Sequence, residues 1–169
     1  DVNGDGLEDL FLGSSKRIKS QLYVQNSNGK FVKTPQKSIE ADSVYEDVDA
    51  QFADFNGDGK VDLVVASGGN EYYGKSEYLA PRVYLNDGKG VFTKKTDAFS
   101  GILMTASVVL VKDINGDKKP DLFLGARGVS WAYGEIPSSY FLINDGSGKF
   151  TDKTEEIAPD LKKSGMVKH

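Results

Sequence analysis

One ten-residue pattern occurs three times in this chain, and it constrains the fold more than any other feature. The copies read DVNGDGLEDL from Asp1, DFNGDGKVDL from Asp54 and DINGDKKPDL from Asp113. Their starts therefore lie 53 and 59 residues apart. A period of about 55 residues is typical of propellers and other repeat arrays, in which each repeat is one small unit of secondary structure.

A second pattern recurs between the acidic loops and indicates what each unit contains. It reads LYVQNSNGKF from Leu22, VYLNDGKGVF from Val83 and FLINDGSGKF from Phe141. Each copy is an apolar run, a turn rich in Asn, Asp and Gly, and then Phe, which is the signature of a β-hairpin. Further short apolar runs flank the acidic loops. One unit is thus predicted to be a four-stranded antiparallel meander, the shape of a propeller blade.

The predicted fold class is therefore all-β, with about three β-propeller blades. Residues 1–46 form a blade without its first strand, 47–104 a complete blade, and 105–169 a complete blade with a connector to a further one. The best helical pattern covers residues 154–165, and Pro159 interrupts it. Since propellers have roughly four to eight blades, the missing partners are the remaining blades of a parent chain or other copies of this chain. We favour a slice of a larger propeller, because the first unit lacks its leading strand and the last stretch resembles the approach to a further leading strand. The chain also has no initial Met and no signal-like segment, which indicates a processed product or a fragment.

The acidic loops have the spacing of a metal site. Calcium takes about six to eight oxygen ligands, and glycines between alternate side chains let the backbone curl so that those side chains converge. Positions 1, 3, 5 and 9 offer side-chain oxygens, and position 7 offers its backbone carbonyl. The predicted Ca²⁺ ligands are Asp1, Asn3, Asp5, Leu7 and Asp9, then Asp54, Asn56, Asp58, Lys60 and Asp62, and finally Asp113, Asn115, Asp117, Lys119 and Asp121.

Other interpretations of these loops differ in how well they fit. An EF-hand needs an acidic residue at position 12 and flanking helices, whereas the chain has Leu12, Val65 or Leu124 there. Magnesium remains an alternative, although it prefers fewer protein ligands and more water. A single loop of this kind is also compatible with a solvated Asx-rich turn. In the third copy Lys118 replaces glycine at position 6, so we expect that site to be the weakest; the loop at Asp1 is expected to be frayed.

Composition excludes several function classes. The net charge is −4, which gives no basic patch for nucleic acid. No apolar run is long enough for membrane insertion. The chain has no Cys, and its one His is His169. Thiolate zinc sites, Cys nucleophiles and His-based triads are therefore excluded within this chain.

The loop DFNGDGKVDL followed by VYLNDGKGVF resembles the FG-GAP/VCBS repeat of integrin-α-like β-propellers. The longer stretches from Ser67 to Phe92 and from Leu122 to Val167 are similar to secreted bacterial repeat proteins related to the ASPIC/UnbV group. This resemblance implies a propeller that is often seven-bladed, calcium between the first two strands of a blade, and an extracellular or periplasmic location. Weak calcium sites independently fit that location, because they fill at millimolar calcium and stay largely empty in cytosol.

Two long loops offer a second set of functional residues, at the end of the blades opposite the acidic loops. Exposed aromatic rings beside Arg suit recognition of a protein or a carbohydrate, although such rings also pack between blades. Three functions remain open: a non-catalytic binding or adhesion module, part of a calcium-dependent polysaccharide lyase, and a structural scaffold. The candidate ligand-binding residues are Tyr72, Tyr73, Tyr78, Arg82, Arg127, Trp131 and Tyr133.

Overall fold

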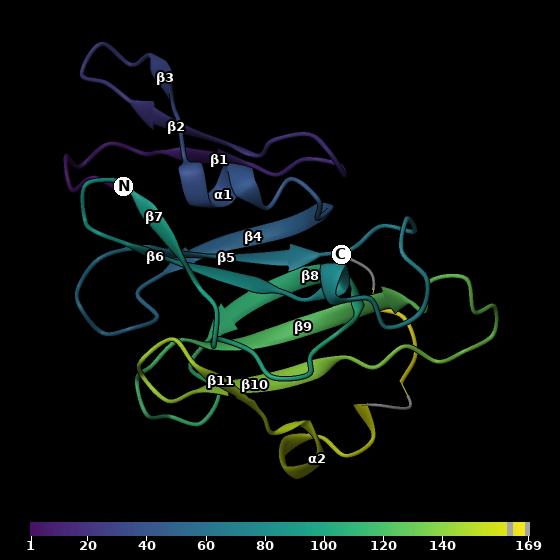
Figure 1. Ribbon diagram of the computed structural model, residues 1–169. Coiled ribbons are helices and arrows are strands. Elements are labelled where there is room, and N and C mark those ends of the chain that lie inside the picture. The colour runs from purple at the N-terminus through teal and green to yellow at the C-terminus, as the bar shows by residue number, and fades with distance from the viewer. Residues whose placement is uncertain (162–163, 168–169) are drawn as a thin grey trace.

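The computed structural model describes residues 1–161 and 164–167, so the end of the predicted third range and His169 lie outside the described residues. The chain forms three antiparallel sheets that follow one another along the sequence and stack side by side (Figure 1). The first sheet has three strands, in the order β1-β2-β3. They are β1 (Leu10–Leu12), β2 (Gln21–Gln25) and β3 (Phe31–Thr34).

The second and third sheets are four-stranded meanders, in which each strand pairs with its neighbour in sequence. This confirms the predicted all-β fold built from propeller-like blades. The second sheet consists of β4 (Asp47–Ala53), β5 (Asp62–Ser67), β6 (Arg82–Asn86) and β7 (Phe92–Lys95). The third consists of β8 (Thr105–Lys112), β9 (Asp121–Gly128), β10 (Tyr140–Asn144) and β11 (Phe150–Asp152).

Helical structure is short and lies in the connections. The helix α2 (Thr154–Ile157) falls inside the predicted helical stretch and ends before Pro159. The helix α1 (Lys37–Ala41) and the 3₁₀ turn η1 (Glu77–Leu79) have no counterpart in the sequence prediction. The α1 helix packs on β7, because Ile39 is buried and the Ser38 hydroxyl accepts a hydrogen bond of 2.9 Å from the N–H of Lys94. The α1 helix has only five residues, which is too short for a helical period of 3.6 residues to be recognised in the sequence.

The strand β5 explains why the sheets stack. All six of its residues are buried, so it reads DLVVAS without polar alternation. Leu63 and Val65 point into the core shared with the first sheet, and Val64 and Ala66 into the core shared with the third. A strand whose two faces are both covered needs apolar side chains on each face. The second sheet is therefore the central layer of the described structure.

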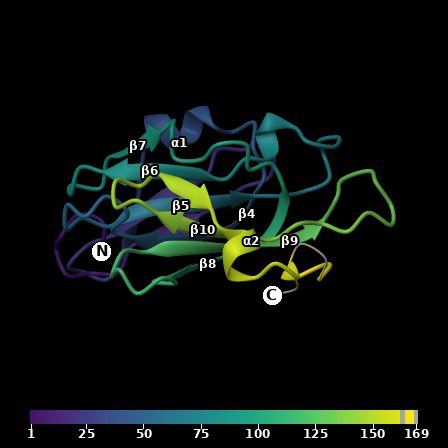
Figure 2. The same ribbon diagram turned by 90° about the horizontal axis from the view of Figure 1, so that it is seen from below.

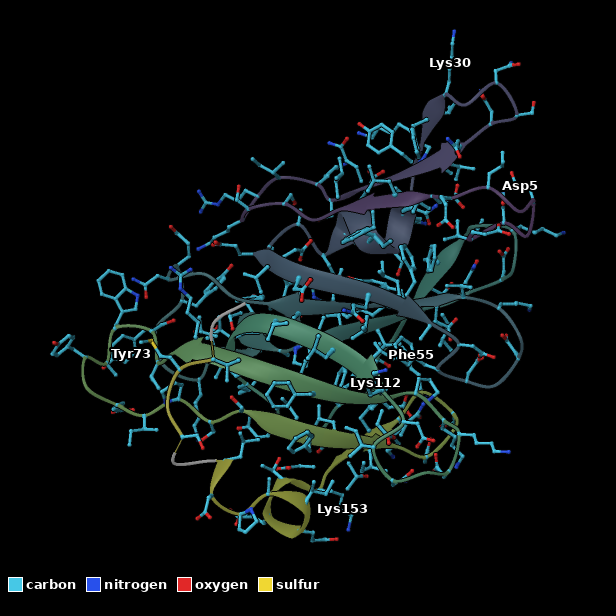
Figure 3. The ribbon with its side chains drawn as sticks, turned by 180° about the vertical axis from the view of Figure 1, so that it is seen from behind. Asp5, Lys30, Phe55, Tyr73, Lys112 and Lys153 are labelled. Carbon is cyan, nitrogen blue, oxygen red and sulfur yellow. The ribbon has the colours of Figure 1, made fainter. Side chains whose placement is uncertain are left out.

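The loops divide between the two ends of the strands. The acidic loops and the tight hairpin turns lie at one end, and the long β5–β6 and β9–β10 loops lie at the other (Figure 2). Figure 3 shows Asp5 and Lys112 at one end and Tyr73 at the opposite end. Within the described ranges, none of the helices has the length and apolar character that crossing a membrane requires. The two sets of predicted functional residues are thus far apart.

Candidate metal centres and aromatic loops

The three acidic loops are built by the same hydrogen bonds, which begin at the position-1 carboxylate. Asp54 accepts the N–H of Gly57 and of Gly59, each at 2.8 Å. Asp1 accepts the corresponding N–H groups of Gly4 and Gly6 at 2.7 and 2.8 Å. In the third loop Asp113 accepts those of Gly116 and Lys118 at 2.7 and 3.0 Å. The carboxylate at position 1 therefore fixes the curved backbone of each loop by accepting these hydrogen bonds.

The position-5 carboxylate is held by its neighbours in an ionised state. The Asn3 amide and the N–H of Leu7 both donate to Asp5, at 2.9 Å each, and these hydrogen bonds lower the pKa of Asp5. Desolvation raises the pKa of Asp58, but hydrogen bonds from Lys60 and Asn56 outweigh it, so that the pKa lies below its ordinary value. A hydrogen bond to a carboxylate favours the charged form. The loops thus keep an anionic oxygen ready for a cation.

The position-9 carboxylate joins each loop to the sheet. Asp62 is fully buried and accepts the N–H of Phe55 at 3.0 Å and that of Asn86 at 2.9 Å. Desolvation raises the pKa of Asp62, these two hydrogen bonds lower it in part, and the nearby carboxylates of Asp58 and Asp54 add to the increase, so that the pKa lies above its ordinary value. Asp9 and Asp121 make the equivalent pairs of hydrogen bonds. The carboxylate at position 9 thus joins the acidic loop to a neighbouring strand. This role depends on how the strands pair, and the sequence alone did not show it.

Carboxylates converge most clearly in the third loop. Among residues 1–161 and 164–167, the only group of three or more His, Cys, Asp or Glu side chains whose ligand atoms all lie within 4.8 Å of one another is Asp113, Asp117 and Asp121. Three carboxylate oxygens suit a hard cation such as Ca²⁺, and no nitrogen or sulfur ligand joins them. Lys118 adopts the left-handed conformation, with φ of 67°, which the glycines at position 6 of the other loops also adopt. The donor set therefore fits calcium, and the order of affinities stays a prediction.

The aromatic loops divide into packed and exposed side chains. Tyr72 and Tyr78 pack together with ring centroids 4.9 Å apart, and the Tyr72 hydroxyl donates to the carbonyl of Val44 at 2.5 Å. By contrast, Tyr73, Trp131 and Tyr133 are 80%, 66% and 108% exposed. The first pair stabilises the loop, and the other three rings face outward.

The two predicted arginines also differ. Arg127 is exposed at the end of β9. Arg82 lies inside, where its guanidinium forms an ion pair with Asp47, donates to the Tyr84 hydroxyl at 3.2 Å and covers the ring of Tyr45 at 4.1 Å. The guanidinium of Arg82 is therefore part of the interior between the first two sheets, and Arg127 remains on the surface with the exposed rings.

A model of the FG-GAP-like repeat matches residues 1–65 and 54–124, which together cover well over half of the chain. The chain belongs to the FG-GAP-like repeat family. No curated protein matches it. Each FG-GAP-like match runs from one acidic loop to the strand that follows the next acidic loop, so the second loop belongs to both matches.

A lysine links the acidic loop to the hairpin in two of the FG-GAP-like units. The ammonium of Lys60 lies 3.5 Å from the Asp58 carboxylate, and that of Lys119 lies 3.6 Å from Asp117. Lys119 also donates to the carbonyl of Asp145 in the hairpin turn at 2.9 Å. The first unit has Leu7 at this position. The ammonium groups of these lysines therefore neutralise part of the charge of the position-5 carboxylates.

An asparagine at the end of β6 and another at the end of β10 connect neighbouring FG-GAP-like units. The Asn86 amide donates to the carbonyl of Val2 in the first acidic loop at 2.7 Å and to that of Val61 at 3.0 Å. Asn144 makes the equivalent bonds to Phe55 and Pro120 at 2.9 and 3.1 Å. The hairpin motif contained these residues, but only the stacking of the sheets shows their second role.

Proposed function

We propose that this chain is a calcium-stabilised segment of a non-catalytic binding or adhesion module that works outside the cytoplasm. The observation that carries the proposal is the separation of two residue sets. The acidic loops occupy one end of the sheets, and the β5–β6 and β9–β10 loops, which carry the exposed Tyr73, Trp131 and Tyr133, occupy the other (Figure 2). Calcium at the first end stabilises the blades, and the second end is left free to contact a partner.

Calcium would be held by the carboxylates and amides at positions 1, 3, 5 and 9 of each loop, with the position-7 carbonyl. Its chemistry would be the neutralisation of clustered charge and the cross-linking of two strands. The convergence of Asp113, Asp117 and Asp121 supports this for the third loop. An extracellular or periplasmic setting follows from the same proposal, because such loops fill where calcium is millimolar. The similarity of the longer stretches to secreted bacterial ASPIC/UnbV-related proteins points to the same setting.

The partner of this module is a protein or a carbohydrate, and its exposed rings suit either. Its neighbours in the propeller are the remaining blades of a parent chain or other copies of this chain. The lyase alternative needs Tyr, Lys or Arg to converge beside calcium, and the separation of the two ends disfavours it. The scaffold alternative needs the aromatic loops to be covered, which fits Tyr72 and Tyr78 but not Trp131 and Tyr133.

The proposal is tested by immobilising the 169-residue chain and screening purified extracellular proteins and an oligosaccharide array in calcium. We expect at least one partner, and we expect Trp131→Ala with Tyr133→Ala to reduce its retention at least tenfold. Val91→Ala, which shortens an apolar side chain that is 55% exposed in a hairpin at the other end of the sheets, serves as the control. Retention that does not change in the Trp131 and Tyr133 variant would contradict the placement of the binding face.

A further inference from the structure

A group of unpaired charges lies beside the exposed rings and is not used by the fold. Glu46, just before β4, is half-buried. Within the described part of the chain, its carboxylate has no hydrogen bond or ion pair, and the same is true of the guanidiniums of Arg17 and Arg127. Arg17 and Arg127 are exposed, whereas the Glu46 carboxylate is partly removed from water, which costs free energy while it is unpaired. A ligand that pairs with Glu46 therefore binds with a gain.

These charges line two connected depressions that span all three sheets. Glu46 and Glu71 border both of them, and the Glu71 carboxylate forms an ion pair with Lys16 at 3.9 Å. The smaller one, of about 300 Å³, is closed by Ser15, Lys16 and Arg17 from the first sheet's loop. The larger one, of about 540 Å³, is lined by Asn70 from the second sheet's loop and, from the third sheet, by Thr105, Arg127 and Ser130 among others. A ligand seated here would contact every blade of the described structure.

The backbone holds Glu46 in this position. Its carbonyl accepts the N–H of Gly68 at 2.9 Å, which ties it to the end of β5. Its carboxylate lies where the side chain of residue 69 would be, so that a methyl group on Gly69 would overlap it. Gly69 also has φ of 80°, a conformation that favours glycine. The glycine therefore leaves room for the carboxylate beside the larger depression.

The rings of the aromatic loop continue the same surface. A third depression, of about 720 Å³, is lined by Trp131, Tyr133 and Ile136, and it shares Gly128, Val129 and Met166 with the larger polar one. Trp131 has φ of 62° and Arg17 has φ of 69°. Such left-handed backbone is costly for residues other than glycine and often occurs at ligand sites. Two of the three described non-glycine residues with positive φ thus border this surface, and the third is Lys118 in a metal loop.

We infer that this surface binds an oligosaccharide; this inference rests on the proposed binding function and specifies its ligand. Carboxylates accept hydrogen bonds from sugar hydroxyls, and guanidiniums donate to ring, hydroxyl or carboxylate oxygens. Flat aromatic rings stack on the apolar face of a pyranose. Glu46, Arg127 and Trp131 supply these three contacts along one continuous surface. A protein partner would bury the same rings, but it has less need of an unpaired carboxylate and an unpaired guanidinium that line one depression.

The test uses the full 169-residue chain in calcium and an array with two arms, neutral hexose oligosaccharides and oligosaccharides that contain uronic acid. The best binder is then titrated by calorimetry. We expect Glu46→Gln and Trp131→Ala each to weaken binding about tenfold, the effect of one lost hydrogen bond to a charged group or one lost ring contact. Glu8→Gln, at the acidic-loop end, is the matched control. A uronic-acid ligand is expected to depend on Arg127 as well, whereas a neutral one is expected to depend mainly on Glu46.

Two results would overturn the saccharide assignment. One is an absence of binding in both arms, and the other is binding that Glu46→Gln and Trp131→Ala leave unchanged. A purified protein that binds through Trp131 and Tyr133, without any oligosaccharide, would reject the saccharide and keep the proposed binding function. Unchanged melting temperatures of the variants would show that any loss of binding is not a loss of folding.

Discussion

Arg82 is a residue whose role depends on its burial. Its side chain is 3% exposed and that of its partner Asp47 is 5% exposed. Removing one member of a buried pair leaves the other charge without compensation, which costs about 3–5 kcal/mol. We therefore expect Arg82→Met to lower the free energy of unfolding by about that amount, as measured by urea denaturation.

A surface pair provides the control for this variant. Lys19 lies 2.8 Å from Glu40, and the Lys19 side chain is 63% exposed. Exposed pairs contribute about 0–1 kcal/mol, so Lys19→Met is expected to change the unfolding free energy by less than 1 kcal/mol. Similar losses in the two variants would show that burial of the Arg82–Asp47 pair does not matter.

Lys118 carries the second prediction at the residue scale. A left-handed residue other than glycine costs about 1–2 kcal/mol, so Lys118→Gly is expected to stabilise the chain by about 1 kcal/mol after the added chain entropy of glycine. Lys118→Ala retains the strain and removes the same charge. We expect calcium titration to show tighter binding at the Asp113 loop in the glycine variant than in the alanine variant. Equal affinity and stability in the two variants would remove the reason for ranking this loop as the weakest.

At the scale of the element, the acidic loop is the unit that calcium should stabilise. When the dissociation constant of a site is one hundredth of the calcium concentration, calcium binding adds about 2.7 kcal/mol to the free energy of unfolding. For a domain of this size that raises the melting temperature by about 5–10 °C for each filled site. Calorimetric melting in calcium and in chelator measures this shift. We expect Asp58→Asn to remove part of this calcium-dependent shift in melting temperature. The control Asp97→Asn lies outside the acidic loops and is expected to leave the shift intact. A melting temperature that chelator does not change would contradict the calcium proposal.

The asparagine links make neighbouring loops depend on each other. Asn86→Ala leaves the carbonyls of Val2 and Val61 without their donor, and each buried group left unsatisfied costs about 1–3 kcal/mol. We expect urea denaturation to show a loss of about 2–4 kcal/mol. Asn28→Ala, in an exposed turn, is expected to have little effect. An equally small effect of Asn86→Ala would show that the loops are held by packing alone.

How far the sequence predicted these elements depends on whether their signal is local. The acidic loops and hairpins have turn residues at fixed positions, so their existence and order follow from the pattern, as do the strands that flank them. The α1 helix is fixed by contacts of Ile39 and Ser38 with β7, which no local pattern records. The same limit applies to the aromatic loops. Tyr72 and Trp131 both lie in long aromatic loops, but tertiary packing half-buries the first ring against Tyr78 and leaves the second exposed.

At the scale of the whole molecule, the outer face of the first sheet repeats the apolar positions that are buried between the other sheets. Counted from the position-9 aspartate, Leu12 corresponds to Val65 and Leu124. Leu12 is 45% exposed, whereas Val65 and Leu124 are 0% and 1% exposed. Phe31 is 47% exposed, and its counterparts Phe92 and Phe150 are 2% and 4% exposed. This face therefore has the side chains of a blade interface.

Exposed apolar surface of this kind favours association, and two different faces that complement each other associate head to tail. The complementary positions lie on the third sheet, where Leu110 is 44% exposed and Ile114 corresponds to the buried Phe55. We expect light scattering of the isolated chain to show a mass that rises with concentration, and Leu12→Lys with Phe31→Lys to hold it at the mass of one chain. Val91→Lys, at a hairpin residue that is 55% exposed, is expected to associate as the unsubstituted chain does. A single-chain mass at every concentration would contradict this expectation. The outer faces of the first and third sheets would then not complement each other, and each would need a blade of a different sequence as its partner.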